Sequence, residues 1–268
     1  MKKYNGLILG IAMFALGVPA AMSGCSVVQG VNAGRAMQAG MTAYQAASIT
    51  DAQVVELCRA SMVQTDAENT LAPANSPYAQ RLARLTGGLR NYDGLNLNFA
   101  AYVKNEVNAF ASGDGSVRVY SGLMDVMDDD QLMAILGHEI GHVKNQDTKD
   151  QVKNAYVTAA AREGLAALDG RLATLTDSML GDIAQSYLGA QYSQRQENEA
   201  DAYGFGFTVA AGRDPYAMAR SMEKLLEISG TAAGSSGGLM QAFSSHPDTA
   251  GRERRMRALA DAHVAARE

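Results

Sequence analysis

Tryptophan is absent from the 268-residue chain, phenylalanine occurs only 6 times, cysteine twice, and charged residues make up 19%. So small a charged fraction, beside 47% hydrophobic residues, argues against intrinsic disorder and allows one sizeable core. The net charge of −5 gives no general attraction to nucleic acid, so we predict no nucleic-acid partner. The scarcity of aromatic residues, set against 14 methionines and many alanines, predicts a helix-rich fold packed with small, adaptable side chains.

The one long apolar run, from Gly6 to about Ala21, is too short to read comfortably as a membrane span. It follows two lysines and precedes Ser23-Gly24-Cys25, which is the layout of a secretory signal. We therefore predict that residues 1–24 are a signal peptide that is removed. The Ser-Gly-Cys end resembles a bacterial lipobox, which predicts a lipid on Cys25. An ordinary signal peptide with a chance cysteine is the alternative.

A lipid on Cys25 would hold the protein on a membrane, to which the rest of its sequence shows no attraction. The residue after the cysteine is Ser26. By resemblance to bacterial lipoproteins, the absence of an aspartate at this position suggests transfer to the outer membrane. We predict a cell-envelope protein anchored in the outer membrane and facing the periplasm, with residues 25–65 as a lipid-anchored tether that includes helices. The sequence does not indicate an oligomeric state.

A lipidated Cys25 leaves Cys58 as the only free thiol, so the mature chain cannot form an internal disulfide. Residues 54–58 have the pattern of an amphipathic helix, and a buried structural thiol is the favoured interpretation. An intermolecular disulfide is the alternative.

Helix and strand signals predict an α+β fold that is mostly helical, with one small sheet. Thr50 with Gln53 forms a capping box, Ser76-Pro77 is a typical helix start, and Asp128 begins a run of candidate N-caps. Apolar or alternating stretches predict three strands at 95–99, 107–111 and 117–120. The remaining helices are predicted at about 152–188, at 192–211, from about 215 and from 249 onward. The first of these is broken near glycines 164, 170 and 181, and a mobile Gly/Ser-rich stretch is predicted at 230–238.

The strongest chemical signal is the pattern H-E-x-x-H from His138 to His142, inside a predicted helix. Residues four apart lie one turn apart on the same face, so the two imidazoles can meet one metal ion. Glu139 lies about 100° around the helix, where its carboxylate can reach a water on that metal. Neutral imidazole ligands suit Zn²⁺, which makes a bound water nucleophilic near neutral pH. A surface helix with incidental histidines is the alternative.

A catalytic zinc ion needs a third protein ligand and one open position. Glu197 and Asp201 lie one turn apart on the next predicted helix, so Glu197 can bind zinc while Asp201 accepts a hydrogen bond from a ligand imidazole. Glu199 lies about 200° from Glu197 and should face away. An exposed acidic helix start is the alternative.

The two motifs together, 137–142 and 197–201, resemble those of the HtpX/Oma-type, CAAX-protease-like family of zinc metallopeptidases, which belongs to the gluzincins. The resemblance covers about residues 70–260 and includes 108–111, 122–124 and Ser245-His246-Pro247 with Arg252. It implies a zincin-like metallopeptidase domain, which we place at residues 66–268. One departure is the lack of the transmembrane helices that HtpX-type members have.

The resemblance also implies that Val117, Arg118, Val119 and Tyr120 form the edge strand that lines the cleft. An extended substrate can add to the unpaired backbone groups of an edge strand. An internal strand is the alternative.

His246 has two catalytic interpretations. It donates a hydrogen bond to the tetrahedral oxyanion, helped by Arg252, or it moves onto the open position of the zinc ion and blocks the site. A structural histidine before a proline turn is the third interpretation.

These observations predict a zinc-dependent endopeptidase with one Zn²⁺ per chain, bound by His138, His142 and Glu197. Glu139 assists attack of the zinc-bound water on the peptide carbonyl and then passes the proton to the leaving amine. By resemblance, the substrates are unfolded or misassembled periplasmic and outer-membrane polypeptides. The alternative function is a chaperone-like client-binding factor with a latent protease site.

Overall fold

The computed structural model describes residues 49–163, 176–189, 191–232 and 246–268. The predicted signal peptide, Cys25, the tether up to residue 48 and most of the Gly/Ser-rich stretch lie outside these residues. Within them, no helix combines the length and the apolar composition needed to cross a membrane.

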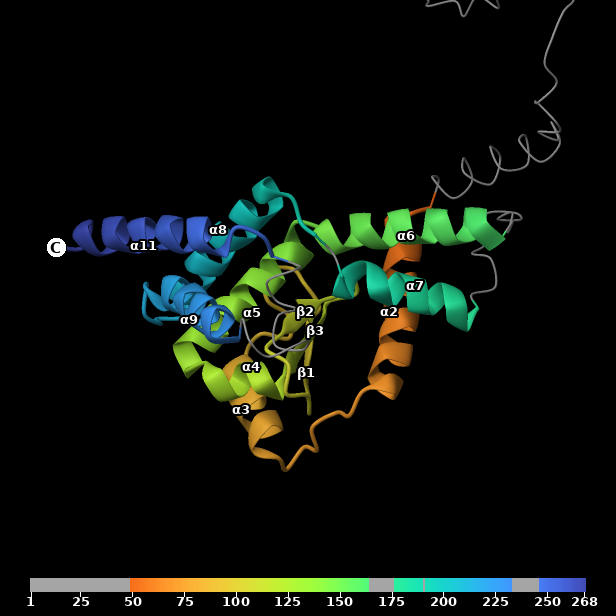
Figure 1. The fold of residues 1–268 in the computed structure, drawn as a ribbon, viewed down its shortest axis with the longest axis horizontal. Helices are drawn as coiled ribbons and strands as arrows, with labels where there is room; N and C mark the ends of the chain where they lie inside the picture. Colours follow the sequence, from red (N-terminus) through yellow and green to blue (C-terminus); the bar gives the residue numbers. More distant parts are fainter. Residues whose placement is uncertain (1–48, 164–175, 190, 233–245) are drawn as a thin grey trace, which may run out of the picture.

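A three-stranded mixed sheet lies at the centre, as Figure 1 shows. It is formed by β1 (Asn98–Tyr102), β2 (Ala109–Ala111) and β3 (Ser116–Tyr120), in the order β1-β3-β2. β3 pairs parallel with β1 and antiparallel with β2.

The prediction that 117–120 form the edge strand is wrong, because β3 is the central strand and all five of its residues are buried. The reason is the turn at 112–115, where Gly115 has a φ of 88° and folds β2 back against β3 as a hairpin. β1 occupies the other side of β3. Among the described strands, β2 is therefore the edge strand that packs against α5.

Helices cover both faces of the sheet, which confirms the predicted α+β class. Val117 and Val119 belong to a core shared with α5, whereas Tyr120 on the other face belongs to a core shared with α2, α6 and α7. Alternation along the strand places the two sets on opposite faces. The helices are α2 (Asp51–Glu68), α3 (Pro77–Thr86), α4 (Ser121–Val126), α5 (Asp129–Lys144), α6 (Asp147–Glu163), α7 (Asp177–Leu188), α8 (Gln194–Ala210), α9 (Ala217–Ala232) and α11 (Thr249–Ala265).

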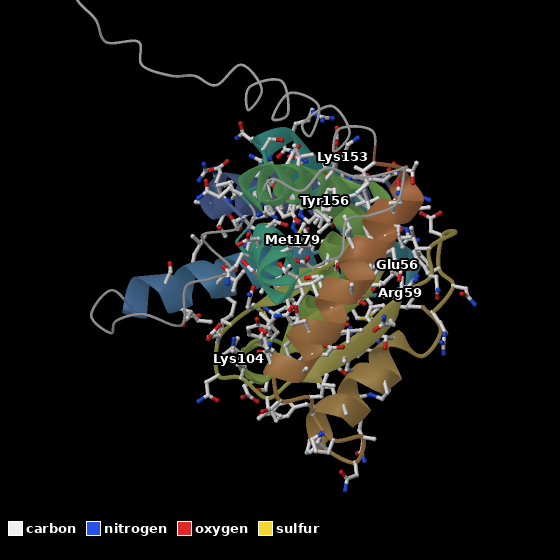
Figure 2. All side chains as sticks on the ribbon, turned by 90° about the vertical axis from the view of Figure 1, so that its right-hand side faces the viewer. Glu56, Arg59, Lys104, Lys153, Tyr156 and Met179 are labelled. Atoms are coloured by element: carbon white, nitrogen blue, oxygen red, sulfur yellow. The ribbon has the colours of Figure 1, made fainter. Side chains whose placement is uncertain are left out.

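α2, α6 and α7 form the layer that faces the viewer in Figure 2, where Tyr156 of α6 and Met179 of α7 meet near α2. The capping box at Thr50 and Gln53 is present and begins α2 as predicted. Cys58 is a buried free thiol, as the favoured interpretation held, and burial raises its pKa to about 11. The predicted helix break near Gly181 is wrong, because this glycine lies inside α7.

Candidate metal centre

The helix α5 carries the two histidines of the first motif. It begins at the predicted N-cap Asp128, which forms a capping box with Gln131. His138 and His142 lie one turn apart, both buried, with their Nε2 atoms 3.1 Å from each other. The sequence pattern thus places two imidazole nitrogens at one point.

The helix α8 supplies the carboxylate. It begins with a capping box between Ser193 and Gln196, which places Glu197 in its first turn, where the helix dipole favours a negative charge. The side chain of Glu197 is fully buried. Its Oε1 lies 3.6 Å from Nε2 of His142, and its Oε2 lies 3.7 Å from Nε2 of His138.

Small residues allow α5 and α8 to approach closely enough for this meeting. A Cβ atom on Gly137 would lie 3.0 Å from the Cα of Gly204, and one on Gly141 would lie 3.0 Å from the Cα of Ala200. Each glycine directly precedes one of the two histidines on α5. The two helices therefore pack backbone to backbone beside the ligands.

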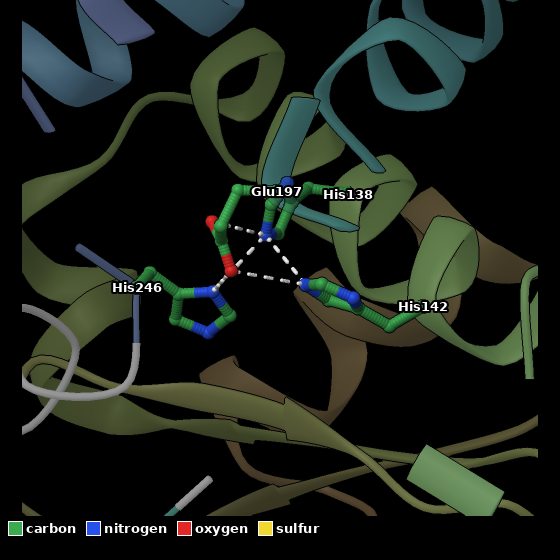
Figure 3. Close-up of side chains that lie close together, drawn as sticks. All are labelled: His138, His142, Glu197 and His246. Atoms are coloured by element: carbon green, nitrogen blue, oxygen red, sulfur yellow. Dashed lines mark hydrogen bonds and ion pairs between the residues drawn. The ribbon is translucent and has the colours of Figure 1, made fainter. Parts of the chain in front are cut away.

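His246 joins this cluster from the segment before α11. Its Nδ1 lies 2.8 Å from Oε1 of Glu197 and 3.2 Å from Nε2 of His138, as Figure 3 shows. The start of α11 holds it there, because Asp248 adopts a left-handed conformation (φ 58°) and caps the helix by accepting from the N–H of Gly251. Of the three interpretations of His246, the geometry favours the one at the metal position.

The four side chains fit a tetrahedral metal ion. Their candidate ligand atoms all lie within 4.8 Å of one another. Zinc–ligand bonds of about 2.0–2.1 Å correspond to a tetrahedron whose corners lie about 3.3 Å apart. The separations among the imidazole nitrogens and the two oxygens of Glu197 are 2.8, 3.1, 3.2, 3.6 and 3.7 Å, which lie on both sides of that value.

The second carboxylate of α8 also lies where the sequence placed it. Oδ1 of Asp201 is 2.9 Å from Nδ1 of His138, so the far nitrogen of this imidazole has an acceptor. Arg252 binds Asp201 through both of that residue's oxygens and binds Oε2 of Glu197 at 2.5 Å. These observed contacts position the two carboxylates, and the predicted help of Arg252 to an oxyanion stays a prediction.

The pKa shifts agree with a centre for a cation. Burial alone would raise the pKa of Asp201, but Arg252 and His138 outweigh it and hold that pKa at about 2. The pKa of Glu197 is likewise far below its usual range, because the surrounding imidazoles outweigh burial.

The two imidazoles of α5 shift in opposite directions. Burial lowers the pKa of His138, which favours the neutral ring. The pKa of His142 is raised to about 9, since Asp147 and Glu197 outweigh burial, so a metal ion must displace a proton there.

Sequence reasoning missed two residues that contact His142. Asp147 accepts a hydrogen bond from Nδ1 of His142 across 2.9 Å. The ring of Tyr192 stacks on the ring of His142 with centroids 3.9 Å apart and an interplanar angle of 15°. From the sequence, Asp147 has no predicted role and Tyr192 lies only at the start of a predicted helix, because no spacing rule marks either one.

A mostly apolar pocket opens beside the cluster. Glu139, buried against His246 with 3.7 Å between its Oε1 and the Nε2 of that ring, lines the pocket together with His138. The remaining wall is formed by Ala109 of β2, Leu123 of α4, Ile135 of α5, Met218, Ser221, Met222 and Leu225 of α9, and Thr249 and Arg252 of α11.

Comparison with known proteins agrees with this geometry. The chain matches the family described as Peptidase family M48 over residues 78–261. It is 36% identical over 246 residues to Metalloprotease LoiP of Escherichia coli strain K12, covering 91% of this chain and 94% of that one. It is 34% identical over 256 residues to Metalloprotease YcaL of the same strain, covering 95% and 97%. It is 32% identical over 140 residues to the Beta-barrel assembly-enhancing protease of that strain, covering 46% and 27%. The donor set on α5 and α8 and these similarities lead to one conclusion: the chain belongs to peptidase family M48 and is a metallopeptidase.

Proposed function

We propose that the protein is a zinc-dependent endopeptidase. The observation that carries this proposal is the meeting of His138, His142 and Glu197 at one point, with Glu139 on the wall of the adjoining pocket. Two imidazoles and one carboxylate are a typical donor set for catalytic zinc. When bound, a zinc ion there supplies a Lewis acid that polarises a carbonyl and makes water nucleophilic near neutral pH.

Glu139 is the general base in this proposal. Its side chain is only 5% exposed, so a proton that it accepts stays inside the pocket. It takes a proton from the attacking water and delivers it to the nitrogen of the leaving amine, which is general acid–base catalysis by one carboxyl group. Buried walls exclude other water from the reacting atoms.

The substrate is an extended polypeptide that adds to the outer edge of β2. The backbone C=O of Asn108 accepts from the N–H of Tyr120, and the N–H of Ser112 donates to the C=O of Ser116. Because backbone groups alternate in direction along an antiparallel strand, the N–H and C=O groups of Ala109 and Ala111 point away from β3. Pairing with these groups requires an unfolded substrate segment but no particular substrate sequence. The apolar pocket favours a Leu-sized or Met-sized side chain next to the scissile bond.

Cleavage of casein by the purified, zinc-loaded protein tests this proposal. We expect the wild type to cut, with apolar residues enriched at one position beside the mapped cleavage sites. Glu139→Gln should cut about 10²–10⁴-fold more slowly while it retains one zinc ion per chain. Glu199→Gln is the matched control, because Glu199 lies exposed on α8. A wild type that binds no zinc contradicts the proposal.

The position of His246 gives a specific reason to keep the second candidate function, a chaperone-like client-binding factor with a latent site. With Nδ1 of His246 at the fourth corner, no corner is left for water or substrate. We propose that this is a closed state and that His246 must leave before a substrate is cut. His246→Ala should then cut casein faster than the wild type. If both proteins bind zinc and unfolded clients but neither cuts, the binding function is favoured.

We also propose that the protein works in the bacterial cell envelope on unfolded or misassembled proteins, held by a lipid on Cys25. The sequence around Cys25 supports the anchor, and the name of one relative, the Beta-barrel assembly-enhancing protease, supports the substrate class. Mass spectrometry of the mature protein from membranes should find a lipid-modified N-terminus at residue 25. Cys25→Ser should move the protein to the soluble fraction, and a wild type in that fraction would contradict the anchor.

A further inference from the structure

The two histidines of the centre have the same kind of partner on their far side. Nδ1 of His138 faces Asp201, and Nδ1 of His142 faces Asp147, each across 2.9 Å. Asp201 belongs to the motif on α8, whereas Asp147 lies outside both motifs. Asp147 is 5% exposed, so its carboxylate has little contact with solvent.

The backbone places Asp147 under His142 in an unusual way. α5 ends at Lys144 with Asn145 as its C-cap, and Gln146 takes a left-handed conformation with φ 65°, which is uncommon for a residue other than glycine. Asp147 follows this turn as the first residue of α6. Acidic residues are favoured at this position, because the N-terminal end of a helix carries a partial positive charge. A strained turn persists where the surrounding contacts require it.

The second oxygen of Asp147 connects it to the helix of the third ligand. Its Oδ1 accepts a hydrogen bond from Nε2 of Gln196 at 3.0 Å. Oε1 of the same amide accepts from the N–H of Ser193 at 3.0 Å and closes the capping box of α8. Gln196 therefore has both ends of its amide engaged, and it stands directly before Glu197. Asp147 is thus fixed between α5 and α8.

The ring of His142 is restrained on its face as well as on its edge. Tyr192 stacks on it nearly parallel, and a stacked ring resists rotation about the χ angles of the histidine. A hydrogen bond to Asp147 at Nδ1 requires the proton to be on that nitrogen. When a metal ion displaces the proton from Nε2, the lone pair of that nitrogen points at the cluster.

We propose that Asp147 is a positioning residue for the metal ligand His142: it holds the ring in the tautomer and the orientation that bind the metal. This inference rests on the proposed zinc site. Partners of this kind typically contribute about 10–100-fold in metal affinity. Asp147 does not touch the substrate, so its effect acts through His142.

The test compares the full-length Asp147→Ala and Asp147→Asn variants with the wild type. Zinc dissociation constants are measured by competition with a chelator, and the visible spectrum of the Co²⁺-loaded protein reports the ligand geometry. Asp150→Ala is the matched control, because Asp150 lies exposed in the same first turn of α6 and carries the same charge. Thermal unfolding of the metal-free proteins separates folding from metal binding.

We expect Asp147→Ala to weaken zinc binding about 10–100-fold and to change the Co²⁺ spectrum. Asp147→Asn keeps an acceptor for Nδ1 and should lose less, and Asp150→Ala should stay within about twofold of the wild type. The inference is wrong if Asp147→Ala unfolds at a lower temperature but leaves the zinc affinity and the Co²⁺ spectrum unchanged. If the alanine variant does not fold, weaker zinc binding or an altered Co²⁺ spectrum in Asp147→Asn supports the inference, and an Asp147→Asn variant with unchanged affinity and an unaltered spectrum overturns it. A wild type without zinc affinity overturns the metal site itself.

Discussion

Replacement of Arg252 by alanine should destabilise the metal-free protein strongly. The guanidinium lies at the centre of a buried charge network, with Nε 2.8 Å and Nη2 2.6 Å from the two oxygens of Asp201. Its Nη1 lies 2.5 Å from Oε2 of Glu197. The three side chains are only 5%, 0% and 0% exposed, so water cannot replace the lost contacts.

The magnitude follows from what alanine leaves behind. Two buried carboxylates lose their common cation, and breaking a buried ion pair by removing one partner costs about 3–5 kcal/mol. That loss is a large fraction of the roughly 5–15 kcal/mol that stabilises a domain. Arg252→Lys keeps the charge but cannot bind Asp201 through two parallel hydrogen bonds, so we expect an intermediate loss.

Urea unfolding in the presence of a chelator measures this effect without compensation by a metal ion. Arg254→Ala is the control, since Arg254 is exposed on the same helix and should change stability by less than about 0.5 kcal/mol. In Asp201→Asn the further loss from Arg252→Ala should be smaller, because the two residues are coupled. A loss below about 1 kcal/mol for Arg252→Ala, together with a large loss of activity, would refute the positioning role and restore the oxyanion interpretation.

Four further predictions concern packing, reactivity, pH and metal. Gly141→Ala should destabilise by about 1–3 kcal/mol in urea unfolding, because its Cβ would meet the backbone of α8 at 3.0 Å; Gly206→Ala, with open space around it, should stabilise by about 0.5–1 kcal/mol. Cys58, whose pKa burial raises to about 11, should react with an alkylating reagent at pH 8 only after unfolding. Burial raises the pKa of Asp66, but bonds from Arg118 and Tyr102 outweigh it, so the net pKa in the folded state is lowered. The stability that ionised Asp66 contributes should be complete above its unfolded pKa of about 3.9 and should disappear as the pH falls through its folded pKa. The difference in unfolding free energy between wild type and Asp66→Asn should therefore shrink below about pH 4. Removal of zinc by a chelator should lower the melting temperature, since zinc at 1,000 times its dissociation constant adds about 4 kcal/mol; an unchanged temperature would contradict a folded-state site.

The parts of the centre that follow local periodicity could be predicted from the sequence. His138 and His142 needed only the helical repeat, and Asp201 needed one more turn of the same rule beyond Glu197. The helix starts at Thr50, Ser76 and Asp128 were also predictable, because capping is local chemistry. The same is true of the fold class.

The order of the strands depended on contacts that local patterns do not contain. Residues 117–120 read as a strand, but nothing in their alternation says whether one or two neighbours pair with it. β1 begins at Asn98, whereas the alternating pattern ended at Phe99, because pairing with β3 and not alternation sets its limits. The strand that lines the pocket beside the candidate metal centre is therefore β2, whose short length of Ala109–Ala111 carried a weaker signal.

The position of His246 was left open for a similar reason. Its contact with Glu197 joins residues 49 apart in the chain and depends on how α11 packs over α8. Asp147 escaped notice because the left-handed turn at Gln146 cannot be read from a glutamine. In both cases the chain supplies an ordinary residue, and the tertiary fold gives it a partner.

The charge balance of the centre is an argument for a cation that is independent of the motif. Four carboxylates are buried around it, on Glu139, Asp147, Glu197 and Asp201, and the one arginine buried among them is Arg252. Without a metal ion, the raised pKa of His142 adds a second positive charge to that of Arg252, so formal charges leave two negative charges; when His142 gives up this proton to bind a metal ion, three remain. A buried charge is costly unless it is paired, and Arg252 pairs with only two of the four carboxylates, with Asp201 through two hydrogen bonds and with Glu197 through one contact. A divalent cation at the point where His138, His142 and Glu197 meet would offset most of that excess, so the fold itself is more consistent with a metal-loaded state than with an empty one.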